Sequence, residues 1–170
     1  GATVFDDVLG ELIGERLESP ASDVVQNAAD GSVDFETTAG LSDYVVISVQ
    51  IPHKVKIGAV IYPHLHWWQN ASQVPNWLIQ YRWQVQGGAN TTAWTSLAMV
   101  TNAFTYTSGV LNQISHTAAG ITPPAGAGLS DIVQFRIIRD NANTSGLFAG
   151  ADAYTGDAQA VSFDIHVEIN

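Results

Sequence analysis

Three segments in which apolar and polar side chains alternate constrain the fold of this chain more than any other feature. They cover residues 61–68, 77–86 and 159–169. Because successive side chains of a β-strand point to opposite faces, each segment predicts a strand with one face toward a core. In the first segment, one face carries Trp67, whereas the opposite face carries His64, His66 and Trp68. A second face of this kind indicates a surface that binds a ligand or packs against another subunit.

Turn-forming residues divide the chain after residue 43 into further short segments of β character. Pro52, Gly58 and the pair Gly87 and Gly88 mark the ends of predicted strands. Roughly eight strands with a single terminal helix predict an all-β protein, a β-sandwich of jelly-roll type with TNF-like or knob-like architecture. The predicted strands cover residues 32–36, 44–51, 59–68, 77–86, 95–100, 104–107, 111–116, 132–139 and 159–169.

The N-terminal segment has a different pattern. Between residues 3 and 18, apolar side chains recur at helical spacing behind Thr3, a residue type that suits a helix N-cap. We therefore expect a short N-terminal helix, or an arm that clamps a neighbouring subunit. Residues 19–42 are expected to be loop, apart from one short strand. This divides the chain into an N-terminal arm or helix with a loop (1–42) and a β-sandwich domain (43–170).

Charge and composition exclude several classes of function. The 170 residues carry a formal charge of −10, and only 13% of them are charged. Since there is no basic patch, we expect no nucleic-acid partner. No apolar run is long enough for a membrane span and no signal peptide is recognised, so we expect no membrane partner. The chain has no cysteine, which excludes disulfides and thiol chemistry.

The histidines suggest three interpretations. His64 and His66 project from one strand face about 7 Å apart, and His166 in the last strand is a candidate third ligand. Neutral imidazole is a common metal ligand, so the first interpretation is a cupin-like protein or enzyme with a divalent metal at His64 and His66. The cupin pattern is incomplete, because Gln69 and Asn70 stand where it expects a glutamate. The second interpretation is a structural role, and the third is a metal or anion site shared on a trimer axis.

The same strand faces carry candidate contacts between subunits. Like the histidines, Arg82 and Arg136 alternate with the core-facing residues of their strands, so they belong to the opposite strand face. We expect them to pair with Asp164 and Glu168 on one sheet face. Half-buried ion pairs more often define a specific interface than raise stability. We predict no catalytic residue. The candidate subunit-interface residues are Tyr62, His64, His66, Trp68, Arg82, Arg136, Asp164, His166 and Glu168.

Two further kinds of ligand have a basis in the sequence. Asp and Asn residues are closely spaced in the loop 139–157, as in calcium loops, but the spacing does not fit an EF-hand, and turn chemistry explains them. Sugars are the second kind: the chain is also a candidate carbohydrate-binding module, because Trp68, Trp94 and Tyr106 are candidate platforms on which sugar rings stack.

Several motifs are distributed over nearly the whole chain. The most specific are Pro-His-x-His-Trp at 63–67 and Phe-Asp-Ile-His at 163–166. Together with the segments at residues 3–7, 48–53, 135–140 and 157–158, they resemble a family of uncharacterised tailed-bacteriophage proteins.

The resemblance implies a virion structural protein of the fibre, knob or decoration type, and it transfers no catalytic residue. We therefore expect a non-catalytic homotrimer that contacts other virion proteins and a host surface glycan. It would be made in the bacterial cytoplasm and located in the phage particle.

Overall fold

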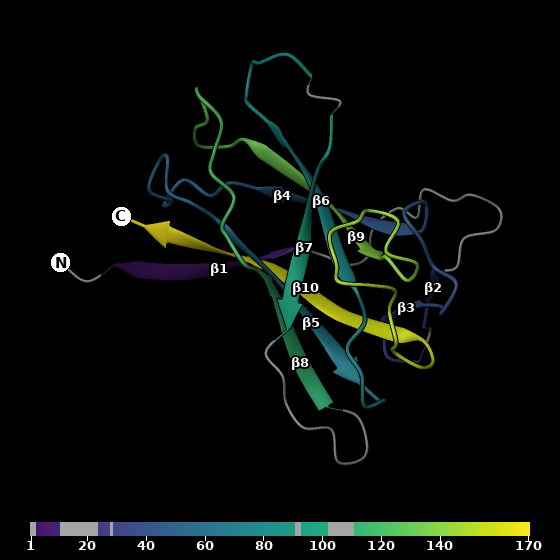
Figure 1. The fold of residues 1–170 in the computed structure, drawn as a ribbon. Helices are drawn as coiled ribbons and strands as arrows, with labels where there is room; N and C mark the ends of the chain where they lie inside the picture. Colours follow the sequence, from purple (N-terminus) through teal and green to yellow (C-terminus); the bar gives the residue numbers. More distant parts are fainter. Residues whose placement is uncertain (1–2, 11–23, 28, 91–92, 102–110) are drawn as a thin grey trace.

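The computed structural model describes residues 3–10, 24–27, 29–90, 93–101 and 111–170. These residues form ten β-strands and no helix, so none of them belongs to a helix that could cross a membrane (Figure 1). The strands are β1 (Val4–Gly10), β2 (Val24–Gln26), β3 (Val33–Phe35), β4 (Tyr44–Gln50), β5 (Tyr62–Gln69), β6 (Trp77–Gln84), β7 (Thr95–Thr101), β8 (Leu111–Thr117), β9 (Ile132–Arg139) and β10 (Ala158–Ile169).

The strand order is that of a jelly roll. One sheet, here called sheet A, has the order β3-β10-β5-β8, and the facing sheet B has the order β4-β9-β6-β7. Strands β3, β5, β8 and β10 thus belong to sheet A and β4, β6, β7 and β9 to sheet B, which is the distribution that two Greek keys give. Strand β7 joins the two sheets, because residues 95–98 pair with β6 and residues 99–101 pair with β8. The predicted jelly-roll β-sandwich is confirmed.

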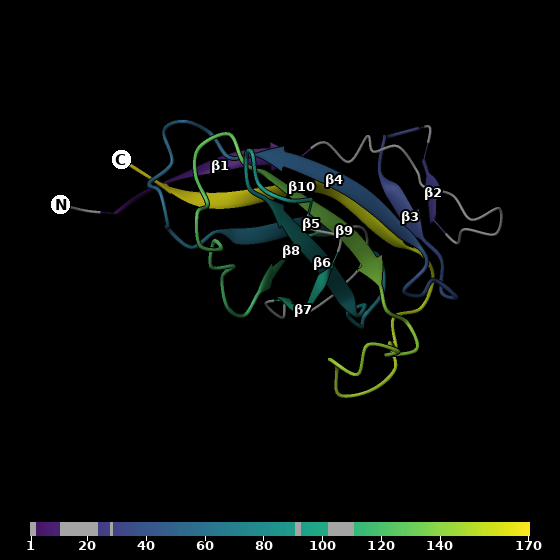
Figure 2. The same ribbon diagram turned by 90° about the horizontal axis from the view of Figure 1, so that it is seen from above.

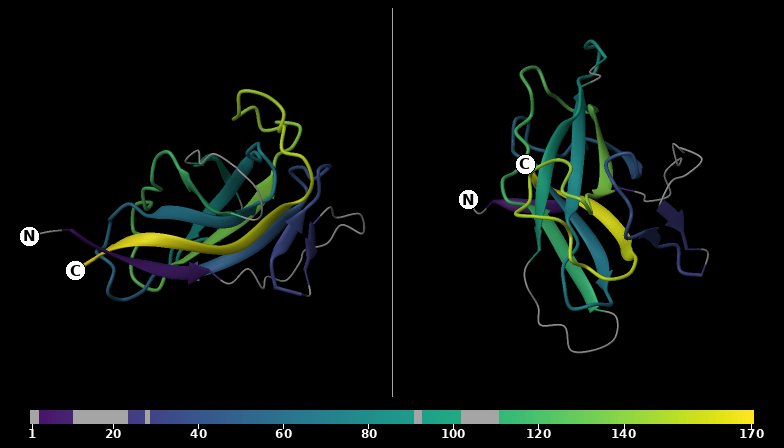
Figure 3. Two further views of the ribbon diagram at one scale, coloured as in Figure 1. Left: turned by 90° about the horizontal axis from the view of Figure 1, so that it is seen from below. Right: turned by 45° about the vertical axis from the view of Figure 1, so that its right-hand side comes forward.

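Two additional strands extend sheet A. Strand β2 pairs with β3. Strand β1 pairs antiparallel with β10, so that Val4 lies opposite Ile169. The two chain ends consequently lie at the same end of the sandwich (Figures 1 and 2). Strand β10 is long enough to serve three partners, β1, β3 and β5, along its length (Figure 3).

The core fills the space between the sheets. Every second residue of the long strands points inward, and most of these inward residues are apolar and buried, as the alternation predicts; Gln113 and Ser115 of β8 are buried polar exceptions. Burying a large apolar side chain contributes about 1.5–3 kcal/mol, so this layer is the main source of stability. The largest members are Phe35, Ile47, Leu65, Trp67, Trp77, Ile79, Phe135 and Phe163.

A β-bulge in β10 changes the alternation. The register with β5 shifts between Ala160 and Ser162. Ala160 therefore points into the core on one side of the bulge and Phe163 on the other, while Val161 is only half-buried. Strict alternation from Phe163 would put Val161 on the core-facing side as well, but the extra residue of the bulge turns it away.

The predicted N-terminal helix is wrong over the residues that the structure describes. Residues 4–10 form strand β1, and residues 11–18 lie outside the described residues. The free edge of β10 offers seven residue pairs to this segment, and that tertiary pairing outweighs a helix that Gly10 already weakened. Strand β2 was expected as loop, and the predicted strand at 104–107 lies outside the described residues.

Gly10 shows why β1 also approaches sheet B. A Cβ atom at this position would lie 2.6 Å from Ile47 and 3.0 Å from Phe163. Only glycine permits this approach, because it has no side chain. Strand β1 pairs with β10 of sheet A and also contacts β4 of sheet B. Residues before position 43 therefore form part of the sandwich.

Candidate functional site

The outer face of sheet A gathers the histidines. In the register of β10, β5 and β8, Asp164 lies opposite His64, and His64 lies opposite His116. Two residues further along β10, His166 lies opposite Asp7 of β1. Strand pairing thus brings together side chains from four strands, and we call His64, His66, His116, Asp164, His166 and Asp7 the histidine cluster.

Three side chains form the centre of the cluster. Asp164 Oδ1 lies 3.6 Å from His64 Nδ1 and 3.7 Å from His166 Nε2. The His64 and His166 rings contact each other with centroids 3.7 Å apart. One ligand atom from each of the three residues lies within 4.8 Å of the other two. This is a two-histidine, one-carboxylate set of potential metal ligands.

The remaining members surround this centre. His66 Nε2 lies 3.2 Å from Asp164 Oδ2, at hydrogen-bonding distance, and His166 Nε2 lies 2.7 Å from Asp7 Oδ1. His116 Nδ1 lies 3.0 Å from the carbonyl oxygen of Thr117. When Nδ1 donates a hydrogen bond to that oxygen, the neutral ring carries its proton on Nδ1, and Nε2 is unprotonated. Sequence reasoning predicted His66 as a ligand; the three residues whose ligand atoms lie within 4.8 Å of one another include Asp164 instead, and His66 contacts the other oxygen of Asp164.

The cluster is half withdrawn from water, and this changes its protonation. Burial, together with the nearby imidazoles of His166, His116 and His66, lowers the pKa of His64 to about 4. Burial raises the pKa of the Asp164 carboxyl, and the attraction of His66 and His166 offsets this only in part. At neutral pH, His64 is therefore a neutral imidazole with a free electron pair, the form that binds a metal.

Exposed apolar side chains surround the cluster on the same face. Among the described residues ten large apolar or aromatic side chains are exposed, and five of them lie here. Leu9, opposite Asp164 on β1, is 73% exposed. Several exposed apolar side chains on one sheet face favour an interaction site over a solvated surface. The five residues are Phe5, Leu9, Tyr62, Val100 and Ile114.

The other predicted interface residues divide between the two sheets. Trp68 and Glu168 share the outer face of sheet A with the cluster, and Glu168 accepts a hydrogen bond from Lys56. Arg82 and Arg136 lie on the outer face of sheet B, with the core between them and Asp164. The predicted pairing of these arginines with Asp164 and Glu168 is therefore wrong.

The arginines of sheet B contact aromatic rings and amides. The Arg136 guanidinium lies 4.2 Å from the centre of the Tyr44 ring and 4.1 Å from that of Trp94. Arg82 also lies over Trp94, at 4.7 Å, and donates a hydrogen bond to Gln134. Arg136 donates a hydrogen bond from Nη1 to an amide oxygen, while its buried Nε has no hydrogen-bond partner. Tyr106, the third predicted sugar platform, lies outside the described residues.

The loop between β9 and β10 projects from one end of the sandwich (Figure 2). Its carboxylates serve the protein itself: Asp140 accepts hydrogen bonds from two backbone N–H groups, and Asp152 binds Arg139, which is fully buried. Turn chemistry and a buried ion pair thus explain the acidic residues that resemble a calcium loop.

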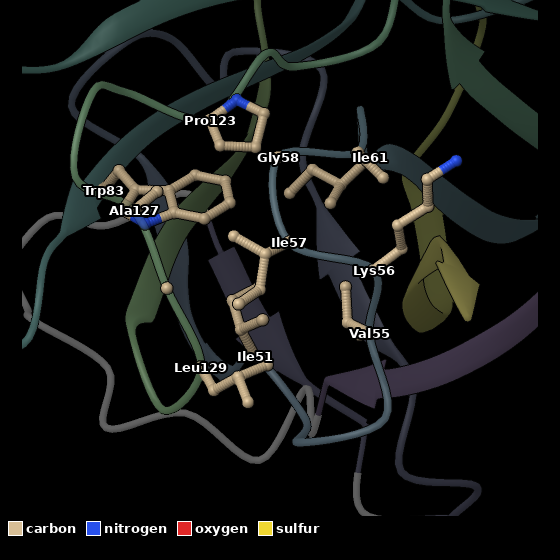
Figure 4. Close-up of a pocket in the computed structure, with 12 residues that line it drawn as sticks. Ile51, Val55, Lys56, Ile57, Gly58, Ile61, Trp83, Pro123, Ala127 and Leu129 are labelled. Carbon is tan, nitrogen blue, oxygen red and sulfur yellow. The ribbon is translucent and has the colours of Figure 1, made fainter. Parts of the chain in front are cut away.

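Two concavities lie away from the cluster. Figure 4 shows an apolar one between Ile57, Trp83 and Leu129, whose volume of about 10 Å³ holds at most one water molecule. The other, of about 290 Å³, is lined by residues that include Tyr81, Arg82 and Thr95.

Sequence reasoning missed Asp7 and His116 as members of the cluster. Asp7 was assigned to a helix. His116 belongs to β8, and the pairing of this strand with β5 was not predicted. His116 alternates with the buried Gln113 and Ser115, and this alternation is the signal that places it on an outer face.

Comparisons with known proteins give distant likenesses. No protein-family model and no curated protein matches the chain. A solved xylan-binding module CBM15 is 14% identical, with 98% of this chain and 97% of that chain covered and a TM-score of 0.38. The enzymatically active domain of tailspike protein 4 from bacteriophage CBA120 is 15% identical, with a TM-score of 0.33. The match covers 98% of this chain and only 18% of that chain. Likenesses this distant carry no functional conclusion.

Proposed function

We propose that this chain is a non-catalytic jelly-roll component of a tailed-phage particle that assembles as a homotrimer through the outer face of sheet A. The two most specific segments of its resemblance to phage proteins, residues 63–67 and 163–166, belong to the adjacent strands β5 and β10. These strands carry most of the histidine cluster. The resemblance and the proposed interface therefore involve the same surface.

The apolar patch around the cluster is the observation that carries this proposal. Five of the ten exposed large side chains in the described part of the chain lie on one sheet face, which argues for a protein partner there. Aromatic and apolar anchors such as Phe5 and Tyr62, which pack edge to face, are typical of interface centres. Closed symmetric assemblies of identical chains are the usual solution for such a surface.

An assembly surface also suits the shape of the site better than an active site does. Catalytic groups generally line a concave pocket. The two concavities described above are lined by other residues, and neither includes a member of the histidine cluster.

Light scattering coupled to size exclusion tests the proposal. We expect the mass of three chains for the native protein, and the mass of one chain for Leu9→Glu and Ile114→Glu, because each places a charge in the proposed interface. Ile57→Glu is the matched control, since Ile57 is 63% exposed but lines the concavity with Trp83 and Leu129 instead of belonging to a strand of sheet A. It should remain trimeric. A native protein with the mass of one chain, or a trimeric Leu9→Glu variant, would contradict the proposal.

The aromatic and arginine side chains of sheet B favour a second function, binding of a carboxylate-bearing glycan. Arg136 is held between the Tyr44 and Trp94 rings, and its buried Nε has no hydrogen-bond partner. Guanidinium groups bind carboxylates, and aromatic rings stack against sugars. A host surface glycan would be the natural source.

Affinity electrophoresis in gels that contain polygalacturonate, with dextran as the neutral reference, separates this function from the first. We expect retardation by polygalacturonate only, lost in Trp94→Ala and kept in Trp68→Ala, which removes an aromatic ring from the other sheet. Equal mobility in both gels, or retardation that Trp94→Ala leaves unchanged, would refute it.

A further inference from the structure

We propose that His64, Asp164 and His166 form a binding site for one divalent first-row transition-metal ion per chain. This site goes beyond the assembly function, because its three ligands come from adjacent strands of a single chain and need no second copy.

The spacing of the ligand atoms fits such an ion. Asp164 Oδ1 is 3.6 Å from His64 Nδ1 and 3.7 Å from His166 Nε2. In a tetrahedral site with bonds of about 2.0–2.2 Å, ligand atoms lie roughly 3.3–3.6 Å apart. The two distances to Asp164 Oδ1 would need to shorten by a few tenths of an ångström at most, and all three ligand atoms lie within 4.8 Å of one another. Both strands are paired on both sides, so the backbone already holds this geometry.

The buried oxygen of Asp164 is an independent sign of a ligand. Oδ1 is buried and has no hydrogen-bond partner, and the Asp164 side chain is only 8% exposed. An unpartnered carboxylate oxygen withdrawn from water costs free energy, which a bound cation would recover. The other oxygen, Oδ2, faces His66 at 3.2 Å, and such a contact to a ligating carboxylate fixes its orientation.

Asp7 supplies a fourth ligand in this proposal. Its Oδ1 lies 2.7 Å from His166 Nε2, and its side chain is 63% exposed, so the carboxylate is free to turn from the imidazole to the metal. Two imidazole nitrogens with carboxylate oxygens suit Zn²⁺, Co²⁺ or Ni²⁺, whereas Ca²⁺ and Mg²⁺ prefer oxygen ligands alone. Since Asp7 belongs to β1, a bound ion would also tie β1 to β10 and β5.

Calorimetric titration of the chelator-treated full chain with ZnCl₂ tests the site. We expect one zinc ion per chain, with binding abolished in His64→Ala and in Asp164→Asn, which keeps the shape of the side chain. His66→Ala should lower the affinity about 10–100-fold, because His66 orients Asp164 without binding the ion. Substitution by Co²⁺ provides a second readout, since a tetrahedral site gives intense visible absorption bands.

His53→Ala is the matched control, because His53 is an exposed histidine that contacts Ser130 in a different part of the molecule. It should bind one zinc ion with unchanged affinity. Circular dichroism of each variant establishes that it is folded. The proposal is overturned if the native chain binds no zinc, if folded His64→Ala binds as the native chain does, or if three chains share one ion. A monomer with one zinc ion would support this site and refute the trimer.

Discussion

The buried ion pair of Arg139 with Asp152 gives a sharp test of how the sandwich is held together. Arg139 is fully buried, and its Nε lies 2.9 Å from Asp152 Oδ2. It also donates hydrogen bonds to the carbonyl oxygens of Phe35, Tyr154 and Gly156, at 3.1, 2.8 and 2.8 Å. One side chain thus connects β9 to β3 and to the loop before β10.

Replacing this arginine with methionine should be strongly destabilising. Arg139→Met keeps much of the apolar volume but leaves a buried carboxylate and three carbonyl groups without their donor. Removing one member of a buried pair costs about 3–5 kcal/mol. For a chain of this length, that corresponds to a fall in Tm of roughly 6–20 °C. Urea unfolding followed by tryptophan fluorescence measures the change.

A second substitution separates charge from packing. In Arg139→Met with Asp152→Leu, the uncompensated carboxylate is gone, so we expect part of the lost stability to return. Lys54→Ala is the control, because Lys54 pairs with Asp6 at the surface, where an ion pair contributes about 0–1 kcal/mol. A loss below about 1 kcal/mol for Arg139→Met, or a double variant as unstable as the single one, would refute the reasoning.

Three further predictions concern other positions. Burial and neighbouring imidazoles lower the pKa of His64 to about 4, whereas an ordinary histidine has a pKa of 6.5. Between these two pH values the unfolded chain therefore binds more protons than the folded chain, so the free energy of unfolding should rise with pH. The rise should be smaller in His64→Gln. Asp131 is buried, which raises its pKa, but hydrogen bonds from Trp83 and two backbone N–H groups give a net lowering. Its contribution to stability should thus be present above 3.8 and lost as pH falls through its folded pKa, and acid unfolding of Asp131→Asn should lack this loss. Gly10→Ala should cost about 1–3 kcal/mol in urea unfolding, because the added Cβ meets Ile47, whereas an unchanged midpoint would show that β1 does not approach sheet B.

Local pattern was sufficient to predict most of the sandwich. Residues 44–50, 77–84 and 132–139 are strands because their apolar side chains recur at every second position, and each lies within one or two residues of its predicted bounds. The jelly-roll order follows from the number and spacing of such strands together with the usual connections.

The wrong predictions of secondary structure and register concern segments whose conformation depends on tertiary contacts. Residues 4–10 have apolar side chains that suit either a helix or an edge strand, and the free edge of β10 selects the strand. The bulge at Ala160 is likewise not visible in composition, because it is set by pairing with β5.

The candidate site was predicted in part for the same reason. Parity placed His64 and His166 on outward strand faces, but only the register between β5 and β10 brings Asp164 between them. Parity also cannot assign a strand to a sheet, so Arg82 and Arg136 were grouped with residues that lie on the far side of the core.

Hydroxyl-radical labelling of the native chain at low and high concentration tests most directly whether the outer face of sheet A is the assembly surface. We expect labelling of Leu9, Phe5 and Tyr62 to fall as the concentration rises, while labelling of Ile57, which is exposed in the loop that lines the concavity with Trp83, stays constant. Equal labelling of Leu9 at both concentrations, in a sample shown to be monomeric at the lower and trimeric at the higher concentration, would contradict this assignment.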